Sequence, residues 1–374
     1  MSKMKGYIDA NVYEEAKRRI KHVMNTFDKL YVAFSGGKDS LAALHLVEEV
    51  YREENVKEKV NVIFRDEELI PDDVVEFVQE YYRSGKYNFK YFAVPLKSQK
   101  FVLGKTYNYI QWDENRKWVR DKPPFAITGE EGVVYDQYTL DEYATREDKG
   151  RIAIITGIRA DESLVRFRAA VNKRDENYIN ASSVPNVKLV KPLFDWTEKD
   201  IFKYFYDNDI RYCHIYDKQI WNKEELRVST PIHAERAKRF DKLKSIYPQF
   251  YQQIVDIFPE MLVQERYWAD YDRYSIIEKY PNTWDGVLQY IREHITDPEE
   301  QKLAKTRLIH AKTFRENTMK KNPKTKKNFG GYPLLYVFKT IVDGGYKRKI
   351  QPKKQITQKE KDYEIQRPTK DRRL

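Results

Sequence analysis

Cysteine is nearly absent from this 374-residue chain, which contains only Cys213. A single thiol excludes an intrachain disulfide, a thiolate-ligated zinc site and an iron–sulfur cluster held by several cysteines of the chain. Long hydrophobic runs are also missing, since no stretch approaches the roughly 20 apolar residues that span a bilayer. Residues 1–10 lack the apolar segment of a secretory signal. We therefore expect a cytoplasmic protein that does not bind membranes.

Positive charge is unevenly distributed along the chain. The net charge is +11, yet residues 301–374 contain 22 Lys and Arg against 6 Asp and Glu, which leaves residues 1–300 with a net charge of −5. A basic segment of this kind often binds a polyanion, so nucleic acid is a candidate partner. The alternative interpretation is a solvated, partly disordered terminus.

Apolar patterns in the first half predict strands that alternate with helices. We expect five strands, at residues 30–34, 60–64, 89–94, 152–156 and 188–191, and three helices, at residues 12–24, 41–51 and 72–82. Such alternation predicts an α/β fold with a parallel, Rossmann-like sheet covered on both faces. Residues 97–150 interrupt the pattern. We interpret them as an insertion over the carboxyl edge of the sheet, where ligands bind in such folds; the alternative is a surface excursion.

The pattern becomes helical after Asp195, with helices expected at residues 197–206, 231–246, 248–258 and 285–294. Thr197 followed by Asp200 resembles a capping box at the start of the first of these. We predict three parts: a nucleotide-binding domain at 1–205 that contains the insertion, a helical domain at 206–319, and a basic, partly disordered tail at 320–374.

A short loop after the first expected strand has the chemistry of a phosphate site. Its residues are Ser35, Gly36, Gly37, Lys38, Asp39 and Ser40. Two glycines allow a sharp turn that brings backbone amides close to an anion, and the next helix adds its N-terminal dipole. The two serines can donate hydroxyls, Lys38 adds a positive charge, and Asp39 can hold Mg²⁺. The Walker A spacing is absent.

This hexapeptide resembles the PP-loop of ATP pyrophosphatases and PAPS reductases, the adenine nucleotide alpha hydrolase-like proteins. Two further segments strengthen the resemblance. The stretch 156–163, Thr-Gly-Ile-Arg-Ala-Asp-Glu-Ser, is similar to the G-x-R-x-x-E-S segment of PAPS reductase-like proteins and is followed by Arg166 and Arg168. Residues 191–201 are similar to the P-x-x-D-W-x-x-x-D-I segment of the same family.

The resemblance implies an adenine nucleotide site, with ATP or PAPS as the ligand and Mg²⁺ bound to Asp39. It implies catalytic roles for Lys38, Asp39 and Arg159. Nucleotide-binding roles follow for the six loop residues and for Gly157, Arg159, Glu162, Ser163 and Arg166. Asp66, after the second expected strand, is a looser candidate that would face the adenosine or its metal, with Glu68 as the alternate. An acidic turn exposed to solvent is the other interpretation.

The chain departs from PAPS reductases proper, which act through a thiol near the C-terminus in a Glu-Cys-Gly-x-His signature. Cys213 lies too early and has no such context, so we interpret it as a small buried hydrophobe. The DNA-phosphorothioation relatives carry a cysteine cluster that is missing here. Residues 226–233 resemble a phage and mobile-element branch that includes IbrA, whose members are often encoded beside a ParB-like protein, a possible partner. Arg227 and His233 are either pocket residues or structural hydrogen-bonders.

Three functional hypotheses remain open from the sequence. The first is a PP-loop enzyme that activates an acceptor by adenylation with ATP, with nucleic acid as a candidate acceptor. The second is a PAPS reductase or sulfotransferase that uses an external thiol or acceptor. The third is a non-catalytic, nucleotide-sensing regulator associated with DNA.

Overall fold

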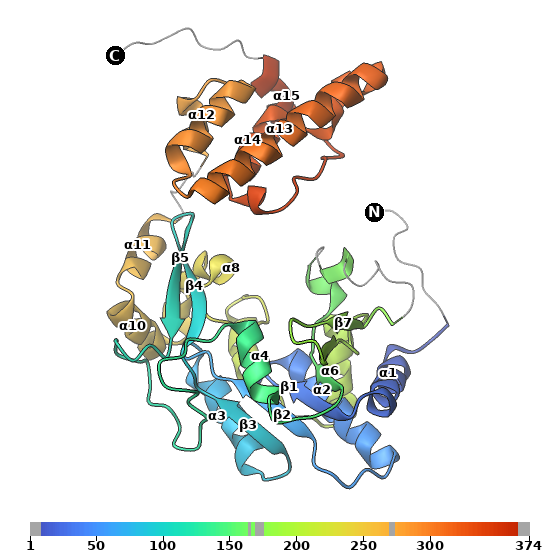
Figure 1. Ribbon diagram of the computed structural model, residues 1–374. Helices are drawn as coiled ribbons and strands as arrows, with labels where there is room; N and C mark the ends of the chain where they lie inside the picture. Colours follow the sequence, from blue (N-terminus) through green and yellow to red (C-terminus); the bar gives the residue numbers. More distant parts are fainter. Residues whose placement is uncertain (1–8, 164–165, 169–175, 269–273, 366–374) are drawn as a thin grey trace. The chain divides into compact units, whose positions relative to one another are not determined.

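The computed structural model describes residues 9–163, 166–168, 176–268 and 274–365 (Figure 1). The chain forms two compact units, Met1–Trp268 and Ala269–Leu374. This division differs from the boundaries that we expected near residues 205 and 319. The helices after residue 206 belong to the first unit as far as Trp268, and most of the expected tail belongs to the second. Residues 366–374 of that tail lie outside the described residues.

The centre of the first unit is a mixed sheet. Its strands among the described residues are β1 (Lys29–Ala33), β2 (Asn61–Arg65), β3 (Asn88–Phe92), β6 (Ile152–Ile155), β7 (Ile179–Ala181) and β8 (Val187–Val190), in the order β3-β2-β1-β6-β8-β7. All neighbours pair in parallel except β7 with β8. The expected parallel α/β sheet is therefore confirmed, with an antiparallel edge strand added. The chain runs outward from β1 in both directions, so a topological switch point lies between β1 and β6.

Side chains that alternate along the strands pack against helices on both faces of the sheet. Four helices share one apolar core with Val32, Phe34, Val62 and Ile155: α1 (Val12–Thr26), α2 (Lys38–Glu53), α3 (Asp72–Arg83) and α6 (Glu198–Asp207). Residues of the opposite parity, such as Tyr31, Ile63 and Ile154, pack with Leu140 and Ala144 of α4 (Gln137–Thr145) on the other face. The expected capping box of Thr197 and Asp200 opens α6. Continuous apolar strands fit this two-sided burial.

The insertion at residues 97–150 contains a β-hairpin followed by α4. The hairpin strands, β4 (Leu96–Val102) and β5 (Lys105–Gln111), pair antiparallel. Five short helices of the first unit follow residue 214. The first, α7 (Ile215–Trp221), belongs to the core shared with α1, α2, α3 and α6. The other four pack with the hairpin in a separate core: α8 (Ala234–Ala237), α9 (Phe240–Ile246), α10 (Pro248–Ile257) and α11 (Glu260–Tyr267). The single helix expected at 231–246 is thus broken between α8 and α9.

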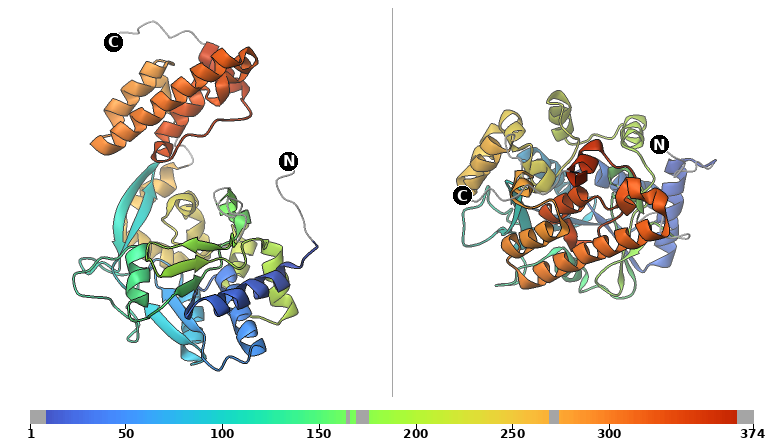
Figure 2. Two further views of the ribbon diagram at one scale, coloured as in Figure 1. Left: turned by 45° about the vertical axis from the view of Figure 1, so that its right-hand side comes forward. Right: turned by 90° about the horizontal axis from the view of Figure 1, so that it is seen from above.

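The second unit is helical and has its own core. Its main helices are α12 (Trp284–His294), α13 (Pro298–Lys321), α14 (Leu334–Val342) and α15 (Gln358–Ile365); the first three pack against one another (Figure 2). Asp297 caps α13 by accepting the Glu300 amide at 2.8 Å, and Pro298 occupies its first turn. Five residues of α14 are buried, so residues 334–342 are part of a folded core rather than of a disordered tail. No helix in the described parts of the chain is long and apolar enough to cross a membrane.

Candidate functional site

The glycine-containing loop lies between β1 and α2, at the topological switch point of the sheet. Ser40 Oγ accepts the Ser35 amide at 3.0 Å and lies 3.0 Å from Ser35 Oγ. The two serine hydroxyls therefore close the turn across its base. Gly36 has φ +73°, and a Cβ there would lie 2.7 Å from a Val78 methyl, so the position requires glycine.

Gly157, in the loop after β6, lies directly against the start of α2. A Cβ at this position would meet the Asp39 carbonyl carbon at 2.4 Å and the Ser40 nitrogen at 2.6 Å. Both contacts are with backbone atoms, which cannot move without disturbing the first turn of α2. The glycine thereby allows the second predicted motif to pack on the first, and both border the cavity described below.

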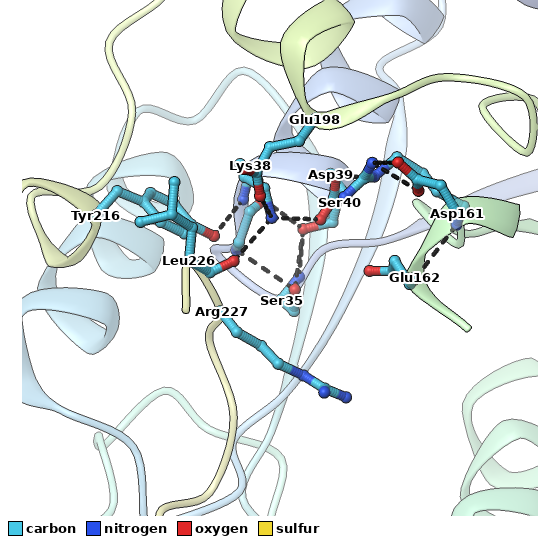
Figure 3. Close-up of polar contacts among 12 residues, drawn as sticks. Ser35, Lys38, Asp39, Ser40, Asp161, Glu162, Glu198, Tyr216, Leu226 and Arg227 are labelled. Carbon is cyan, nitrogen blue, oxygen red and sulfur yellow. Dashed lines mark hydrogen bonds and ion pairs between the residues drawn. The ribbon is translucent and has the colours of Figure 1, made fainter. Parts of the chain in front are cut away.

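Lys38 is buried, and its polar groups contact three other segments (Figure 3). Its backbone amide donates to the Tyr216 hydroxyl at 2.6 Å. Its ammonium group donates to Leu226 O at 2.9 Å and lies 3.2 Å from Asp39 Oδ2 and 3.5 Å from Glu198 Oε2. Burial raises the pKa of Tyr216, which keeps its hydroxyl protonated. In this conformation the hydroxyl accepts an amide that the loop would otherwise offer to a phosphate.

Arg159 connects the second motif to the loop. Its Nε donates to Asp39 Oδ1 at 2.6 Å, and its Nη1 contacts both oxygens of Asp161 at 2.8 and 2.9 Å. The residue is 3% exposed. Such charge-assisted bonds are short and strong, so they fix both partners. Arg159 therefore holds Asp39 in place and borders the cavity.

A cavity of about 620 Å³ opens beside this loop, within the usual size of a small-ligand site. It lies at the carboxyl ends of β1, β2 and β6, as expected at a switch point. Nine of the predicted residues line it: Ser35, Gly37, Lys38, Asp39, Ser40, Gly157, Arg159, Glu162 and Arg166. Gly36 shapes the turn, and Ser163, whose hydroxyl accepts the Arg166 amide at 3.2 Å, is not among the lining residues.

Among the described residues four arginines line this cavity, and three of them, Arg65, Arg159 and Arg166, are paired with carboxylates that also line it. Burial, together with the neighbouring Arg227 guanidinium, lowers the pKa of Arg166. Arg166 forms an ion pair with Glu162. The Arg227 guanidinium makes no hydrogen bond or ion pair with any described residue, and Figure 3 shows it extending away from the Lys38 contacts. The unpaired positive charge of Arg227 favours an anionic ligand.

The segment that carries Arg227 is held by Gln219, which is 1% exposed. Gln219 Nε2 donates to Arg227 O at 2.8 Å, and the Arg227 amide donates to Gln219 Oε1 at 2.9 Å. Residues 225–228, which we call the strap, line the cavity and contact the loop through the hydrogen bond from Lys38 to Leu226 O. Of the two residues whose roles the sequence left open, Arg227 lines the cavity and His233 does not.

Asp66, another predicted site residue, lies outside the cavity lining. It is 2% exposed and accepts hydrogen bonds from the Tyr91 hydroxyl at 2.6 Å and from Arg120. Glu68, the alternate, is fully buried; it accepts the Trp112 amide at 2.6 Å and pairs with Arg116. Both carboxylates anchor the insertion to the end of β2, and neither lines the cavity.

Arg65, at the end of β2, and Asp141 line the cavity, whereas Asp66 does not. Arg65 and Asp141 form an ion pair, and Gln137 lines the cavity beside them. Burial raises the pKa of Asp141. Gln137 and Asp141 belong to α4, so the insertion borders the cavity. No sequence motif marked these residues; the end of the second strand was the only available signal.

Two other predicted features have structural roles. In the third motif, Asp195 accepts two hydrogen bonds from Arg19 at 2.8 and 2.7 Å, and Trp196 donates to Val12 O at 3.0 Å, which ties α1 to the start of α6. Cys213 is 1% exposed, and burial raises the pKa of its thiol to about 11. It is absent from the cavity lining, in agreement with its interpretation as a buried hydrophobe.

The fit of Mg²⁺ depends on Asp39. Among the described residues, no group of three or more His, Cys, Asp or Glu side chains is arranged to hold a metal ion. Asp39 is the carboxylate of the loop itself, and it already contacts Arg159 and Lys38. Mg²⁺ is usually bound through one or two carboxylates together with substrate phosphates. The residues therefore fit a metal that arrives on the phosphates of a nucleotide rather than one held by the protein alone.

A parallel α/β sheet with a glycine-containing phosphate loop at its switch point defines the class of nucleotide-binding α/β proteins. The model of the phosphoadenosine phosphosulfate reductase domain matches residues 29–254. The chain belongs to this family, which confirms the family resemblance found in the sequence; the phage and mobile-element branch stays a prediction.

Two curated relatives match the chain, and both are named as uncharacterized proteins. The chain is 31% identical over 221 residues to the uncharacterized protein YbdN of Escherichia coli, covering 55% of this chain and 54% of that one. It is 25% identical over 252 residues to the uncharacterized protein MJ0973 of Methanocaldococcus jannaschii, covering 66% and 49%. The chain thus spans about half the length of the curated relatives that it matches.

Three solved structures that match the chain are distant from it in sequence and have low TM-scores. A phosphoadenylyl-sulfate reductase from Candida auris is 14% identical with a TM-score of 0.35, over 57% of this chain and 94% of that one. An FMN adenylyltransferase from Candida glabrata, in complex with FAD and pyrophosphate, is 13% identical with a TM-score of 0.37, over 57% and 64%. A U34-tRNA thiolase from Methanococcus maripaludis is 18% identical with a TM-score of 0.33, over 68% and 79%.

Proposed function

We propose that this chain is an enzyme that binds ATP, with its phosphates on the loop 35–40, and transfers the adenylyl group to an acceptor. The observation that carries the proposal is the cavity at the switch point, where the loop faces Arg159, Arg166 and Arg227. Its volume suits a nucleotide together with part of a second substrate. Nucleic acid is the acceptor that we consider first, because of the basic C-terminal unit.

In this reaction an acceptor oxygen forms a bond to the α-phosphorus while the bond between the α-phosphorus and the bridging oxygen breaks. Pyrophosphate leaves with the bonding electrons, and the acceptor proton passes to solvent. Lys38 and the arginines neutralise the charge that develops on the leaving group, and the loop amides orient it. A magnesium ion bound to the phosphates beside Asp39 would add further charge neutralisation.

Thiol chemistry within the chain is poorly supported. A thiolate is the nucleophile in reductive cleavage of PAPS, whereas Cys213 is buried, has a raised pKa and lies outside the cavity lining. We therefore favour adenylation over a PAPS reductase or sulfotransferase, which would need an external thiol or acceptor. A nucleotide sensor without catalysis would use the same cavity, and turnover distinguishes it.

The test has two stages. Calorimetric titration of the full chain with ATP, PAPS and AMP, with and without Mg²⁺, measures binding; we expect ATP to bind more tightly than AMP, because the loop contacts the β- and γ-phosphates. Incubation with ATP, Mg²⁺ and oligonucleotide or small-molecule acceptors then measures pyrophosphate release. Binding of ATP without pyrophosphate release under any acceptor would favour the sensor. Tighter binding of PAPS than of ATP would favour the reductase or sulfotransferase, and failure of every nucleotide to bind would refute the site itself.

A further inference from the structure

Five lysines gather where α13 ends and the following turn begins. They are Lys320, Lys321, Lys324, Lys326 and Lys327, and we call residues 320–328 the lysine turn. All five are exposed, and their ammonium groups make no ion pair or hydrogen bond with any described residue. The sequence contains no Asp or Glu between Glu316 and Asp343. No ion pair among the described residues therefore neutralises the five ammonium groups.

The lysine turn is an ordered part of the second unit rather than a loose tail. Asn322 caps the turn by accepting the Lys324 amide at 3.1 Å, and the Thr325 hydroxyl donates to Asn322 O at 2.6 Å. Phe329 and Gly330 then adopt left-handed backbone angles, with φ of 52° and 58°, which reverse the chain. A Cβ on Gly330 would lie 3.0 Å from Arg315 O, so the turn packs closely on α13.

Arg315 secures the reversal from the other side. Its guanidinium lies 5.0 Å from the centre of the Phe329 ring and makes two hydrogen bonds with Glu364, at 2.8 and 2.7 Å. Arg315 and Glu364 are both mostly buried. The backbone that carries the five lysines is thus fixed before any ligand binds, so little entropy is lost on ordering it.

Five like charges within eight residues repel one another, and the negative end of the α13 dipole compensates for only part of that repulsion. A polyanion would relieve it and release its own counterions. We propose that the lysine turn binds the phosphodiester backbone of nucleic acid. Lysine is a point charge without a fixed hydrogen-bonding fork, so it suits phosphates and reads no base sequence. The proposal is independent of the function proposed for the first unit.

The composition of the turn favours nucleic acid over an anionic membrane surface. Basic segments that lie on membranes combine their lysines with Trp, Phe or Leu that enter the lipid. Residues 320–328 contain no large apolar side chain, and the remaining residues are Asn, Pro and Thr. Such a surface has charge and polar groups but nothing to insert.

The experiment uses the full chain and two triple variants with the same change in net charge. The first reverses Lys324→Glu, Lys326→Glu and Lys327→Glu. The matched control reverses Lys57→Glu, Lys86→Glu and Lys149→Glu, three exposed lysines of the first unit for which the structure describes no side-chain hydrogen bond or ion pair. Fluorescence anisotropy measures binding to a labelled DNA duplex and to single-stranded RNA between about 50 and 200 mM salt.

We expect the lysine-turn variant to bind at least about tenfold more weakly at low salt, and its plot of log affinity against log salt to be shallower by about three units, one for each lost phosphate contact. The control variant should retain the slope of the natural chain. Equal losses in the two variants, or none in either, would overturn the proposal. So would binding to phosphatidylserine vesicles without binding to either nucleic acid. Comparison of DNA with RNA identifies which source of phosphodiester is preferred.

The neutral variant Lys324→Gln, Lys326→Gln and Lys327→Gln removes the three positive charges without adding negative ones. It therefore separates the loss of lysine contacts from repulsion by the introduced glutamates. If the turn binds phosphates directly, this variant should lose affinity to an intermediate degree. Unchanged binding by the glutamine variant would contradict direct contact, because the lysines themselves would then contribute nothing. Thermal unfolding of all three variants checks that the second unit remains folded.

Discussion

Gln219 hydrogen-bonds both backbone polar groups of Arg227, with its amide nitrogen on the carbonyl at 2.8 Å and its amide oxygen on the N–H at 2.9 Å. The two residues are eight positions apart. The side-chain amide of the buried glutamine makes the two hydrogen bonds to Arg227 that a neighbouring strand would make in a β-sheet. The next carbonyl toward the N-terminus, Leu226 O, accepts the Lys38 ammonium. Gln219 and Lys38 together therefore hold the backbone of the strap beside the loop 35–40.

Replacement of Arg227 by Ala should weaken ATP binding without loss of the fold. A charge-assisted contact to phosphate contributes about 1.5–3 kcal/mol, so we expect the dissociation constant for ATP to rise by about tenfold or more. Arg227→Lys should recover part of the affinity. Calorimetry with ATP is the measurement, and Lys223→Ala, on the same segment but outside the cavity lining, is the control. Equal affinity in Arg227→Ala and the control would remove Arg227 from the site.

Replacement of Gln219 by Leu should act through Arg227. The substitution leaves two backbone groups of the strap without their partner, at a cost of about 1–3 kcal/mol for each that stays buried. We expect lower thermal stability together with weaker ATP binding. In the double variant with Arg227→Ala, the loss of ATP affinity should be smaller than the sum of the two single losses. Strictly additive losses would mean that Gln219 does not position Arg227.

Gly157→Ala should disrupt the contact between the two motifs. The added methyl group would lie 2.4 Å from the Asp39 carbonyl carbon, which forces either the start of α2 or the loop after β6 to shift. Overpacking of this kind costs about 1–3 kcal/mol. Thermal unfolding and ATP titration should both show a loss, whereas Gly85→Ala, at an open turn, should leave ATP binding unchanged. Tight ATP binding in Gly157→Ala would show that the two loops move independently.

Asp39→Ala should affect stability and metal dependence together. It leaves the buried Arg159 with Asp161 as its remaining carboxylate partner, so we expect a loss of about 1.5–3 kcal/mol in the free energy of unfolding. If Asp39 also meets the metal on the nucleotide, Mg²⁺ should no longer strengthen ATP binding. Denaturant unfolding and titration with and without Mg²⁺ separate the two effects. Asp161→Ala should lower stability but keep the magnesium dependence; an identical loss of that dependence would argue against a role for Asp39.

Cys213 should react slowly with thiol reagents. Because burial raises its pKa to about 11, the thiolate fraction near neutral pH is small, and it should grow about tenfold for each unit of pH up to that value. Native protein should therefore be alkylated by iodoacetamide far more slowly than unfolded protein, and faster as the pH rises. Cys213→Ala should retain ATP binding and any turnover. Loss of turnover in that variant with ATP binding intact would revive a thiol mechanism.

The sequence by itself was sufficient for the fold class and the core of the site. Continuous apolar strands alternating with amphipathic helices predict a parallel sheet, and the hexapeptide at residues 35–40 requires a tight turn ahead of a helix. These are local signals, because a glycine pair or an apolar run acts within a few residues. The second motif was also readable, since its glycine and arginine recur at a spacing known from the family.

Only the tertiary structure decided which side chains at the strand ends face the cavity. Arg65 and Asp66 are neighbours, and successive side chains of a strand point to opposite sides; the sequence suggested Asp66, while the structure turns Arg65 to the cavity and Asp66 to the insertion. Arg227 and Asp141 line the cavity beside the loop, although both are far from the loop in the sequence. The contact between Lys38 and Leu226, for example, joins residues 188 positions apart. The limit of the expected tail was likewise decided by packing, because α14 is buried against α12 and α13. Such contacts depend on how distant segments meet, and no local pattern encodes that.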